Sequence, residues 1–142
     1  MEIRLLTKED YEAYLPLINE FRPTVFSRAP FQSVLDYIGQ VGEIWIGTLG
    51  DQIVATATIL YERKLIFNIS TVAHIEDVCV SESQRKKGFG KQLIHHLFEM
   101  ARSKECYKVT LDCVDSNVPF YTSCGLQRRG NQMCELIANL HP

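Results

Sequence analysis

The chain has 142 residues, 46% of them hydrophobic and 23% charged, which is ordinary for one globular domain that can bury a full core. Its formal net charge of -2 argues against a general nucleic-acid binder, so any anion site must be local. The five cysteines form an odd set without a CxxC pair, which supports neither a zinc site nor a disulfide framework.

The compartment follows from the cysteines and from the apolar segments. Reduced thiols in the cytosol are the simplest interpretation of the cysteine set. The first residues, MEIRLLTKEDY, contain no apolar leader, and the stretch IVATATILY is too short and too polar to span a bilayer. We therefore expect one cytoplasmic domain over residues 1–142, with neither a membrane nor a nucleic acid as its partner.

The chain begins with a short strand, EIRLL, followed by two helices. Thr7, with Asp10 three residues later as a capping-box variant, predicts the start of an amphipathic helix over residues 8–21. Pro30 suits the first turn of a second helix, which ends at Gly39.

The next segments are typical of β-structure. EIWIGTL and QIVATATILYE flank Gly50-Asp51, which predicts a two-residue hairpin turn. KLIFNI and AHIEDVCV predict two further strands.

The second half of the chain alternates between helices and strands. We expect a long helix over residues 88–103, a strand at YKVTLDCV, a short helix at NVPFYTSCG and a last strand over residues 131–137. This order describes a mixed sheet covered by helices, in the α/β or α+β class.

A basic glycine turn, SQRKKGFGKQ, stands at the start of the long helix. Four cations lie there although the helix dipole is already positive at that end. Gly88 and Gly90 let backbone N–H groups approach a ligand, and a glycine turn between a strand and a helix forms an anion-binding nest. The cations are explained if the ligand is a polyanion, although a solvated lysine-rich turn is the alternative. Neither a P-loop nor a dinucleotide fingerprint fits the spacing.

The surroundings of this turn carry a resemblance. Arg85-x-x-Gly88-x-Gly90, after HIEDVCV and before an amphipathic helix, resembles the acyl-CoA motif of the GNAT N-acetyltransferase superfamily. The resemblance implies the GNAT fold, a mixed central sheet with helices on both faces, and acetyl-CoA as co-substrate without a metal. The residues that it implies in cofactor binding are Val78, Val80, Arg85, Lys86, Lys87, Gly88, Phe89, Gly90, Lys91, Asn117, Phe120 and Tyr121.

A narrower resemblance covers residues 74–125. HIED, CYKVTLDC and NVPFY, in this order, are similar to the glucosamine-6-phosphate N-acetyltransferases of UDP-N-acetylglucosamine biosynthesis. It implies transfer of the acetyl group to the 2-amino group of D-glucosamine 6-phosphate. Because the pKa of such an amine should be about 8, a neutral fraction exists near neutral pH, and positioning is the main task of the protein.

The same resemblance implies roles for individual residues. The backbone carbonyl of Asp112 orients the amine, while Glu76 and Asp77 line the sugar site, Glu76 being also a weaker candidate for proton relay. The phenol of Tyr121 would donate a hydrogen bond or a proton to the departing sulfur. The alternatives are that the carboxylates only meet solvent and that Tyr121 is a core residue.

The resemblance also implies substrate contacts at Thr24 and Lys64. The alignment around FRPTVFSRAP, which contains Thr24, is loose, and Thr24 could simply cap a turn. These enzymes are typically homodimers with sites shared across the interface. Family members often carry a cation near the end of the C-terminal strand, but here the strand reads QMCELIANL, with Glu135 and Leu136 at that place. We therefore expect Lys64 and either Arg128 or Arg129 to bind the sugar phosphate, unless both arginines only solubilise a surface turn.

Three alternatives remain at this point. The protein could be a GNAT acetyltransferase for another small amine, such as a polyamine, an antibiotic or a peptide N-terminus. It could be a catalytically silent GNAT domain that binds CoA. It could also be an uncommitted α/β interaction domain, which leaves the basic turn unexplained.

Overall fold

The computed structural model describes residues 1–138, and within them five strands form one mixed sheet in the order β1-β2-β3-β4-β5. The strands are Glu2–Leu5 (β1), Gly42–Leu49 (β2), Gln52–Arg63 (β3), Thr71–Val80 (β4) and Lys108–Thr110 (β5). The first four pair antiparallel in sequence, whereas β5 runs parallel to β4. This mixed sheet confirms the predicted fold class.

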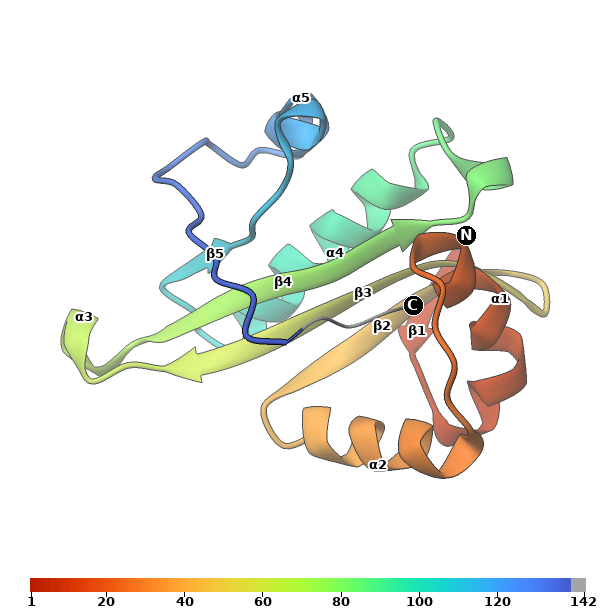
Figure 1. Ribbon diagram of the computed structural model, residues 1–142. Helices are drawn as coiled ribbons and strands as arrows, with labels where there is room; N and C mark the ends of the chain where they lie inside the picture. Colours follow the sequence, from red (N-terminus) through yellow and green to blue (C-terminus); the bar gives the residue numbers. More distant parts are fainter. Residues whose placement is uncertain (139–142) are drawn as a thin grey trace. The chain divides into compact units, whose positions relative to one another are not determined.

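The helices of the described residues are Tyr11–Phe21 (α1), Arg28–Ile38 (α2), Ile66–Ile69 (α3), Phe89–Ser103 (α4) and Val118–Ser123 (α5), with 3-10 turns at Lys8–Asp10 (η1), Glu82–Gln84 (η2) and Asp115–Asn117 (η3). Within residues 1–111, α1 and α2 lie on one face of the sheet and α4 lies on the other (Figure 1). Neighbouring residues of β2 show the two faces, because successive side chains of a strand point to opposite sides. Trp45 meets His96 of α4 with ring centroids 4.2 Å apart, while Ile46 packs with α1 and α2.

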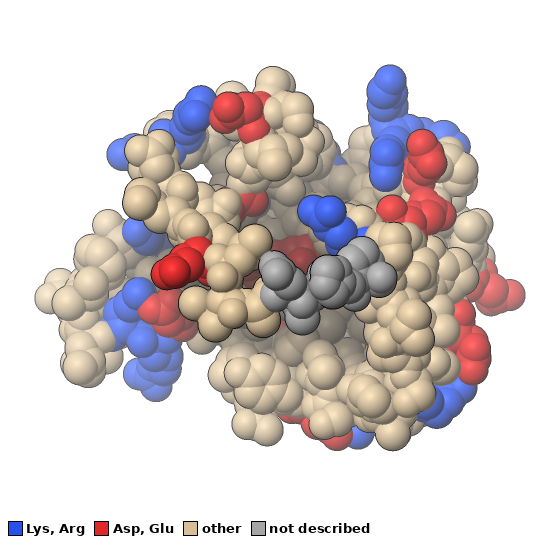
Figure 2. Space-filling view, viewed as in Figure 1, with Lys and Arg blue, Asp and Glu red and all other residues tan. Residues whose placement is uncertain are grey.

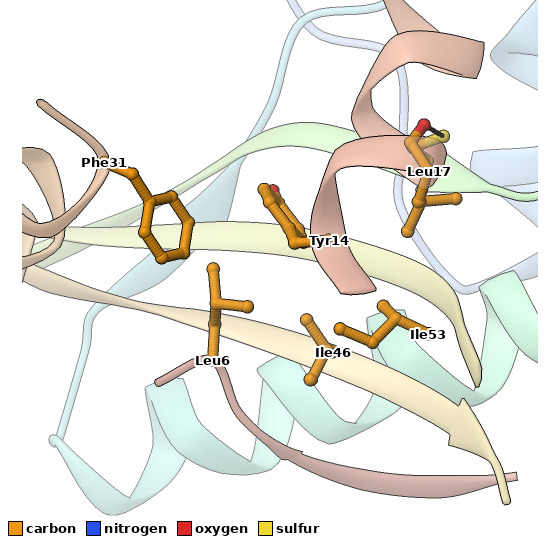
Figure 3. Packing of buried hydrophobic residues seen from close by; sticks show 7 residues of the cluster. Leu6, Tyr14, Leu17, Phe31, Ile46 and Ile53 are labelled. Atoms are coloured by element: carbon orange, nitrogen blue, oxygen red, sulfur yellow. Dashed lines mark hydrogen bonds between the residues drawn. The ribbon is translucent and has the colours of Figure 1, made fainter. Parts of the chain in front are cut away.

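One apolar cluster joins α1 and α2 to the sheet, and Figure 3 shows its side chains pointing toward one another. Its buried members are Leu6, Tyr14, Leu17, Phe31, Ile46, Ile53 and Cys79. Tyr14 and Leu17 lie three residues apart and therefore on the same face of α1. The buried phenol of Tyr14 keeps a polar partner, the hydroxyl of Thr56 at 3.3 Å.

The predicted helix at residues 8–21 is confirmed, with its first turn in the tighter 3-10 form. The Asp10 carboxylate accepts hydrogen bonds from the backbone N–H of Thr7 at 2.8 Å and from its hydroxyl at 2.9 Å. Arg4 of β1 donates to the same carboxylate at 2.7 Å. The guanidinium of Arg4 is the main reason why the pKa of Asp10 is lowered to about 2.

The other predicted helices are also confirmed. Pro30 lies in the first turn of α2, which Gly39 ends, and the long helix predicted over residues 88–103 is α4. Its buried face consists of Gly90, Leu93, Ile94, Leu97 and Ala101.

The two hairpins differ from each other in how well the sequence predicted them. The Gly50-Asp51 turn is confirmed, because Leu49 and Gln52 are partners on either side of it. The strand predicted at KLIFNI is wrong: the pairing of Arg63 with Thr71 requires the chain to reverse between them. Residues 66–69 form α3 at the hairpin tip (Figure 1), with Phe67 at a φ of 55°.

Two C-terminal expectations also need correction. The strand predicted at YKVTLDCV is formed only over Lys108–Thr110 and ends there. The last strand, predicted over residues 131–137, is wrong, since the described residues 131–138 contain no strand. Their apolar side chains Met133, Leu136 and Ile137 are exposed, so no neighbouring strand fixes an extended conformation there.

The chain divides into two compact units, the first ending at Leu111 and the second beginning at Asp112. The first unit holds the sheet, α1, α2 and α4. The second holds η3, α5 and the segment that follows. A single domain over residues 1–142 stays a prediction.

Candidate functional site

The basic glycine turn leads from the end of β4 through η2 to the first residue of α4. Lys86 has a φ of 62° and Gly88 a φ of 83°, so the turn contains two residues in the left-handed region. A Cβ at Gly88 would meet nothing within 4 Å, so glycine is favoured there by backbone conformation and not by crowding. The space beside the turn is therefore open to a ligand.

The cations of the turn are exposed. Figure 2 shows Lys and Arg side chains at the corner that the turn occupies in Figure 1, with acidic side chains beside them. Arg85, Lys86, Lys87 and Lys91 all reach solvent, whereas Phe89 is half-buried and Gly90 is buried under the first turn of α4. The Nε of Arg85 donates to the carbonyl of Val80 at 3.2 Å, and Lys87 donates to the Gln84 side chain at 2.9 Å. The cations therefore lie where the sequence predicted them, at the start of the long helix.

A β-bulge interrupts β4 directly before the turn. Two residues, Asp77 and Val78, lie opposite Ala57 alone, since Thr56 pairs with Cys79 and Thr58 with Glu76. Asp77 has a φ of 50°, a conformation that aspartate tolerates better than most side chains. The bulge exposes the carboxylates of both Glu76 and Asp77.

The other side of β4 offers backbone hydrogen-bonding groups. Within the described residues, the register of β5 covers only Val72, Ala73 and His74 of β4. Val78 and Val80 lie on β4 beyond this register, and both are half-buried. An extended ligand with amide groups can pair with such a strand edge.

Two polar side chains near the C-terminal end of α1 form hydrogen bonds that the sequence did not indicate. The side-chain oxygen of Asn19 accepts from the backbone N–H of Thr24 at 3.0 Å. Glu20 accepts from the Ser81 hydroxyl at 3.1 Å and from the backbone N–H of Glu82 at 2.8 Å. The only signal for them was a pair of polar residues at a helix end, which is common at the protein surface.

Lys64 lies at the other end of β4, at the base of the hairpin tip. It forms an ion pair with Glu62, whose second oxygen lies 2.8 Å from Nε2 of His74. The hydrogen bond from Lys64 is the main reason why the pKa of Glu62 is lowered. Glu76 is five residues along β4 from Thr71, the partner of Arg63, or about 17 Å at the usual rise of a strand. One chain therefore does not bring Lys64 beside Glu76.

The second unit carries Tyr121 on α5. Burial is the main reason why the pKa of this phenol is raised to about 12, so it is protonated at neutral pH. The rings of Phe120 and Tyr121 lie edge to face with centroids 4.9 Å apart. Asn117 precedes α5 and donates its N–H to the carbonyl of Val114 at 2.9 Å.

Other residues of this unit are mostly exposed. The carboxylate of Asp112 accepts from Gln132 at 3.3 Å, and Arg128 pairs with Asp115 at 3.2 Å. Arg129 donates to Gln127 at 3.2 Å. Glu135 and Leu136, which stand where family members often carry a cation, are exposed to solvent in the single chain.

Two cysteines of this unit differ in burial. Cys124 is buried, whereas Cys113 is exposed because β5 ends at Thr110 and the residues that follow leave the sheet.

The first unit has an open pocket of about 760 Å³. Its lining includes Leu35, Ile38, Val41, Tyr61, Arg63 and Lys104. Thr71, the first residue of β4, also lines the pocket. The pocket therefore adjoins the end of β4 that is remote from the glycine turn.

Within residues 1–138, no group of three or more His, Cys, Asp and Glu side chains could hold a metal ion. No helix of these residues is long and apolar enough to cross a membrane.

Similarity to known proteins agrees with this geometry. The glucosamine 6-phosphate N-acetyltransferase of Schizosaccharomyces pombe is 43% identical over 81 residues, which cover 57% of this chain and 73% of that protein. The enzyme of the same name from Trypanosoma brucei brucei is 33% identical, and the alignment covers 94% of this chain and 93% of that protein. The crystal structure of glucosamine-6-phosphate N-acetyltransferase from Arabidopsis thaliana superposes with a TM-score of 0.85 at 28% identity, covering 96% of this chain and 98% of the other.

The acetyltransferase (GNAT) family matches residues 11–126, which include β2 to β5, the glycine turn and α5. Acetyl-CoA is the co-substrate of this family, and the exposed cations, the left-handed turn and the edge of β4 beyond the register of β5 fit a ligand with phosphates at one end and amides along its arm. The chain belongs to the acetyltransferase (GNAT) family.

Proposed function

We propose that this protein transfers the acetyl group of acetyl-CoA to the 2-amino group of D-glucosamine 6-phosphate, giving N-acetylglucosamine 6-phosphate and CoA. The observation that carries this proposal is the similarity to glucosamine 6-phosphate N-acetyltransferases, which extends over 94% of the chain for the Trypanosoma brucei brucei enzyme. The proposed setting is UDP-N-acetylglucosamine biosynthesis in the cytoplasm.

Binding of acetyl-CoA is assigned to the glycine turn and β4. The N–H groups and cations of residues 85–91 bind the pyrophosphate, because an anion at a helix N-terminus is stabilised by free N–H groups and by the helix dipole. The backbone of Val78 and Val80 pairs with the amides of the pantetheine arm. Asn117 and Phe120 flank the same arm near the thioester.

The amine then attacks the thioester carbonyl carbon, and the C–S bond breaks. Since the sugar amine has a pKa of about 8, much of it is neutral near pH 7.5 and needs orientation more than deprotonation. The carbonyl of Asp112 accepts a hydrogen bond from the amine, while Glu76 and Asp77 hold the sugar hydroxyls. The proton that the nitrogen loses after attack goes to solvent or through Glu76.

Tyr121 stabilises the departing sulfur. With a pKa of about 12, its phenol is a much weaker acid than a thiol, whose pKa is about 8.5. Complete proton transfer to the thiolate would be uphill by roughly 5 kcal/mol. Tyr121 therefore acts as a hydrogen-bond donor to the developing thiolate, and the thiolate leaves before it is protonated.

The sugar phosphate is assigned to Lys64 together with Arg128 or Arg129, with Thr24 near the sugar. Because Lys64 lies far from Glu76 in one chain, this assignment requires the Lys64 of a second copy in the proposed homodimer. Each cation already has an acceptor in the chain, Glu62 for Lys64, Asp115 for Arg128 and Gln127 for Arg129. A dianionic phosphate is a stronger acceptor than these groups and can replace or share them.

A homodimer with sites shared across its interface is part of this proposal. The exposed fractions of Met133, Leu136 and Ile137 are 91%, 80% and 90%, so a single chain leaves a contiguous apolar segment in water. A second copy could cover it. Light scattering during size-exclusion chromatography would test this, and a monomer at micromolar concentration would contradict it.

The test of the function is release of CoA thiol from acetyl-CoA. We expect fast release with glucosamine 6-phosphate, much slower release with plain glucosamine, and little with a polyamine, an aminoglycoside or a peptide N-terminus. Equal rates for both sugars, or a preference for another amine, would overturn the assignment. Tight CoA binding without turnover of any amine would instead identify a silent CoA-binding domain.

A further inference from the structure

An acidic residue contacts the segment that carries the basic turn. Glu20 is the penultimate residue of α1, and its two carboxylate oxygens accept from the Ser81 hydroxyl and from the backbone N–H of Glu82, at 3.1 and 2.8 Å. Ser81 is buried, and its own N–H donates to the carbonyl of Val54 at 2.8 Å. This carboxylate therefore fixes the point where the chain leaves the sheet and enters η2.

On electrostatic grounds alone, a carboxylate at this position weakens the binding of phosphates by the turn. It lies beside a turn whose cations bind phosphates in the proposed function, and an acid there repels the same phosphates. Its presence is explained if it supplies something that outweighs this repulsion. The two hydrogen bonds are such a gain, because a carboxylate that accepts N–H and O–H donors makes the stronger class of hydrogen bond.

The other hydrogen bonds of the chain after Ser81 are few and lie near the surface. The N–H of Gln84 donates to the carbonyl of Ser81 at 2.9 Å, and the N–H of Arg85 donates to that of Glu82 at the longer distance of 3.4 Å. The exposed side chains of Arg85 and Lys87 donate to the carbonyl of Val80 and to Gln84. The left-handed residue Lys86 follows directly, and η2 has no buried side chain of its own. A short exposed segment of this kind frays unless its ends are fixed.

We propose that Glu20 is a positioning residue for the basic glycine turn. It fixes the start of η2 so that the N–H groups of residues 85–90 already face the CoA phosphates. The proposal rests on the proposed function in assigning CoA to this turn. Pre-organisation of this kind raises affinity because the free protein does not have to order the turn on binding. The effect therefore belongs to binding of CoA and not to the acetyl-transfer step.

The sign of the effect separates this proposal from simple charge repulsion. If Glu20 acted only as a negative charge, Glu20→Gln would bind CoA more tightly, since one repulsive charge is gone. If it positions the turn, Glu20→Gln binds CoA more weakly, because an amide offers one acceptor oxygen where two donors need partners.

The experiment measures the Kd of CoA by isothermal titration calorimetry in the full chain, for the parent and four variants. We expect Kd to rise roughly threefold in Ser81→Ala, which loses the hydrogen bond to Glu20 and the longer one to the Ser83 hydroxyl, and about tenfold in Glu20→Gln and Glu20→Ala. Glu12→Ala is the matched control, because Glu12 is an exposed acid of the same helix that pairs with Arg28 and does not contact η2. Its Kd should equal that of the parent.

Kinetics of the same variants supply a second readout. The KM for acetyl-CoA should rise with the Kd, while kcat and the KM for the amine stay unchanged, and the melting temperature of each variant shows that it is folded. An unchanged or lower Kd in folded Glu20→Gln overturns the proposal, as does an equal rise of both KM values. If the parent binds CoA but acetylates no amino sugar, the proposed function fails while the Kd comparison still decides the role of Glu20.

Discussion

The two units of the chain divide stability and chemistry between them. The sheet and its helices, within residues 1–111, contain nearly all of the buried side chains, whereas Cys124 is the one fully buried residue among the described residues 112–138. Yet Asp112 and Tyr121, the residues proposed closest to the reacting atoms, belong to the second unit. Substitutions in the first unit should therefore change the free energy of unfolding, and those in the second should change the rate.

The largest effect is expected from a core residue of the first unit. Leu97 of α4 has no exposed surface, so Leu97→Ala should lower the free energy of unfolding by about 2 to 5 kcal/mol through lost burial and a cavity. Val114→Ala, an exposed apolar residue of the second unit, is the control and should change it by less than about 0.5 kcal/mol. Urea denaturation measures both. Similar losses for the two variants would break the comparison.

The converse effect is expected at Tyr121. Tyr121→Phe removes the hydrogen bond to the thiolate and should lower kcat by roughly 10- to 1000-fold with little change in KM. Its unfolding midpoint in urea should stay close to that of the parent. An unchanged kcat, with chemistry rate-limiting in the parent, would return Tyr121 to the role of a core residue.

A third substitution concerns the part of the first unit that binds ligand. Lys86→Glu combined with Lys87→Glu should raise the KM for acetyl-CoA about tenfold, because repulsion replaces attraction at the pyrophosphate, and should leave the KM for the sugar unchanged. Added salt should weaken CoA binding in the parent more than in the variant. A selective loss of sugar affinity would show that the turn binds the other substrate.

Much of this division was visible in the sequence. The glycine turn was predictable because its signal is local: glycines, cations and a helix start lie within ten residues. The tip of the β3–β4 hairpin was not, since KLIFNI has the composition of a strand and only the pairing of Arg63 with Thr71 makes it a turn. The bulge at Asp77 and the contacts of Glu20 depend on residues distant in sequence, so no local pattern predicts them.

A smaller effect on stability is expected from Asp10 as a function of pH. Its pKa is lowered to about 2 in the folded protein by Arg4, so its contribution is present above pH 4 and is lost as the pH falls through 2. Asp10→Asn should lower the free energy of unfolding by about 1 kcal/mol at pH 7. This value is smaller than the pKa shift alone would give, because Arg4 is partly exposed and solvent screens the pair. The difference between the parent and the variant should shrink below pH 4. Urea denaturation at pH 7 and pH 3 checks this, and a difference that does not change with pH would contradict it.

The smallest effects are expected at the cations assigned to the sugar phosphate. Lys64→Ala, and either Arg128→Ala or Arg129→Ala, should reduce the preference for glucosamine 6-phosphate over glucosamine a few-fold each, as expected for exposed charges. The ratio of kcat/KM for the two sugars measures it. Lys8→Ala, which removes an exposed cation paired with Asp36, should leave the ratio unchanged. If all three variants keep the parent ratio, the phosphate is bound elsewhere.

The edge of β4 beyond the register of β5 has a consequence for inhibitor selectivity. A ligand that pairs with this edge contacts main-chain atoms, whose positions depend on the fold more than on the side chains. A structure only 28% identical to this chain still superposes over 96% of it with a TM-score of 0.85, so the backbone is similar although most side chains differ. A peptide mimic designed for this edge would therefore inhibit many acetyltransferases alike, and discrimination between them has to come from atoms that reach beyond the strand.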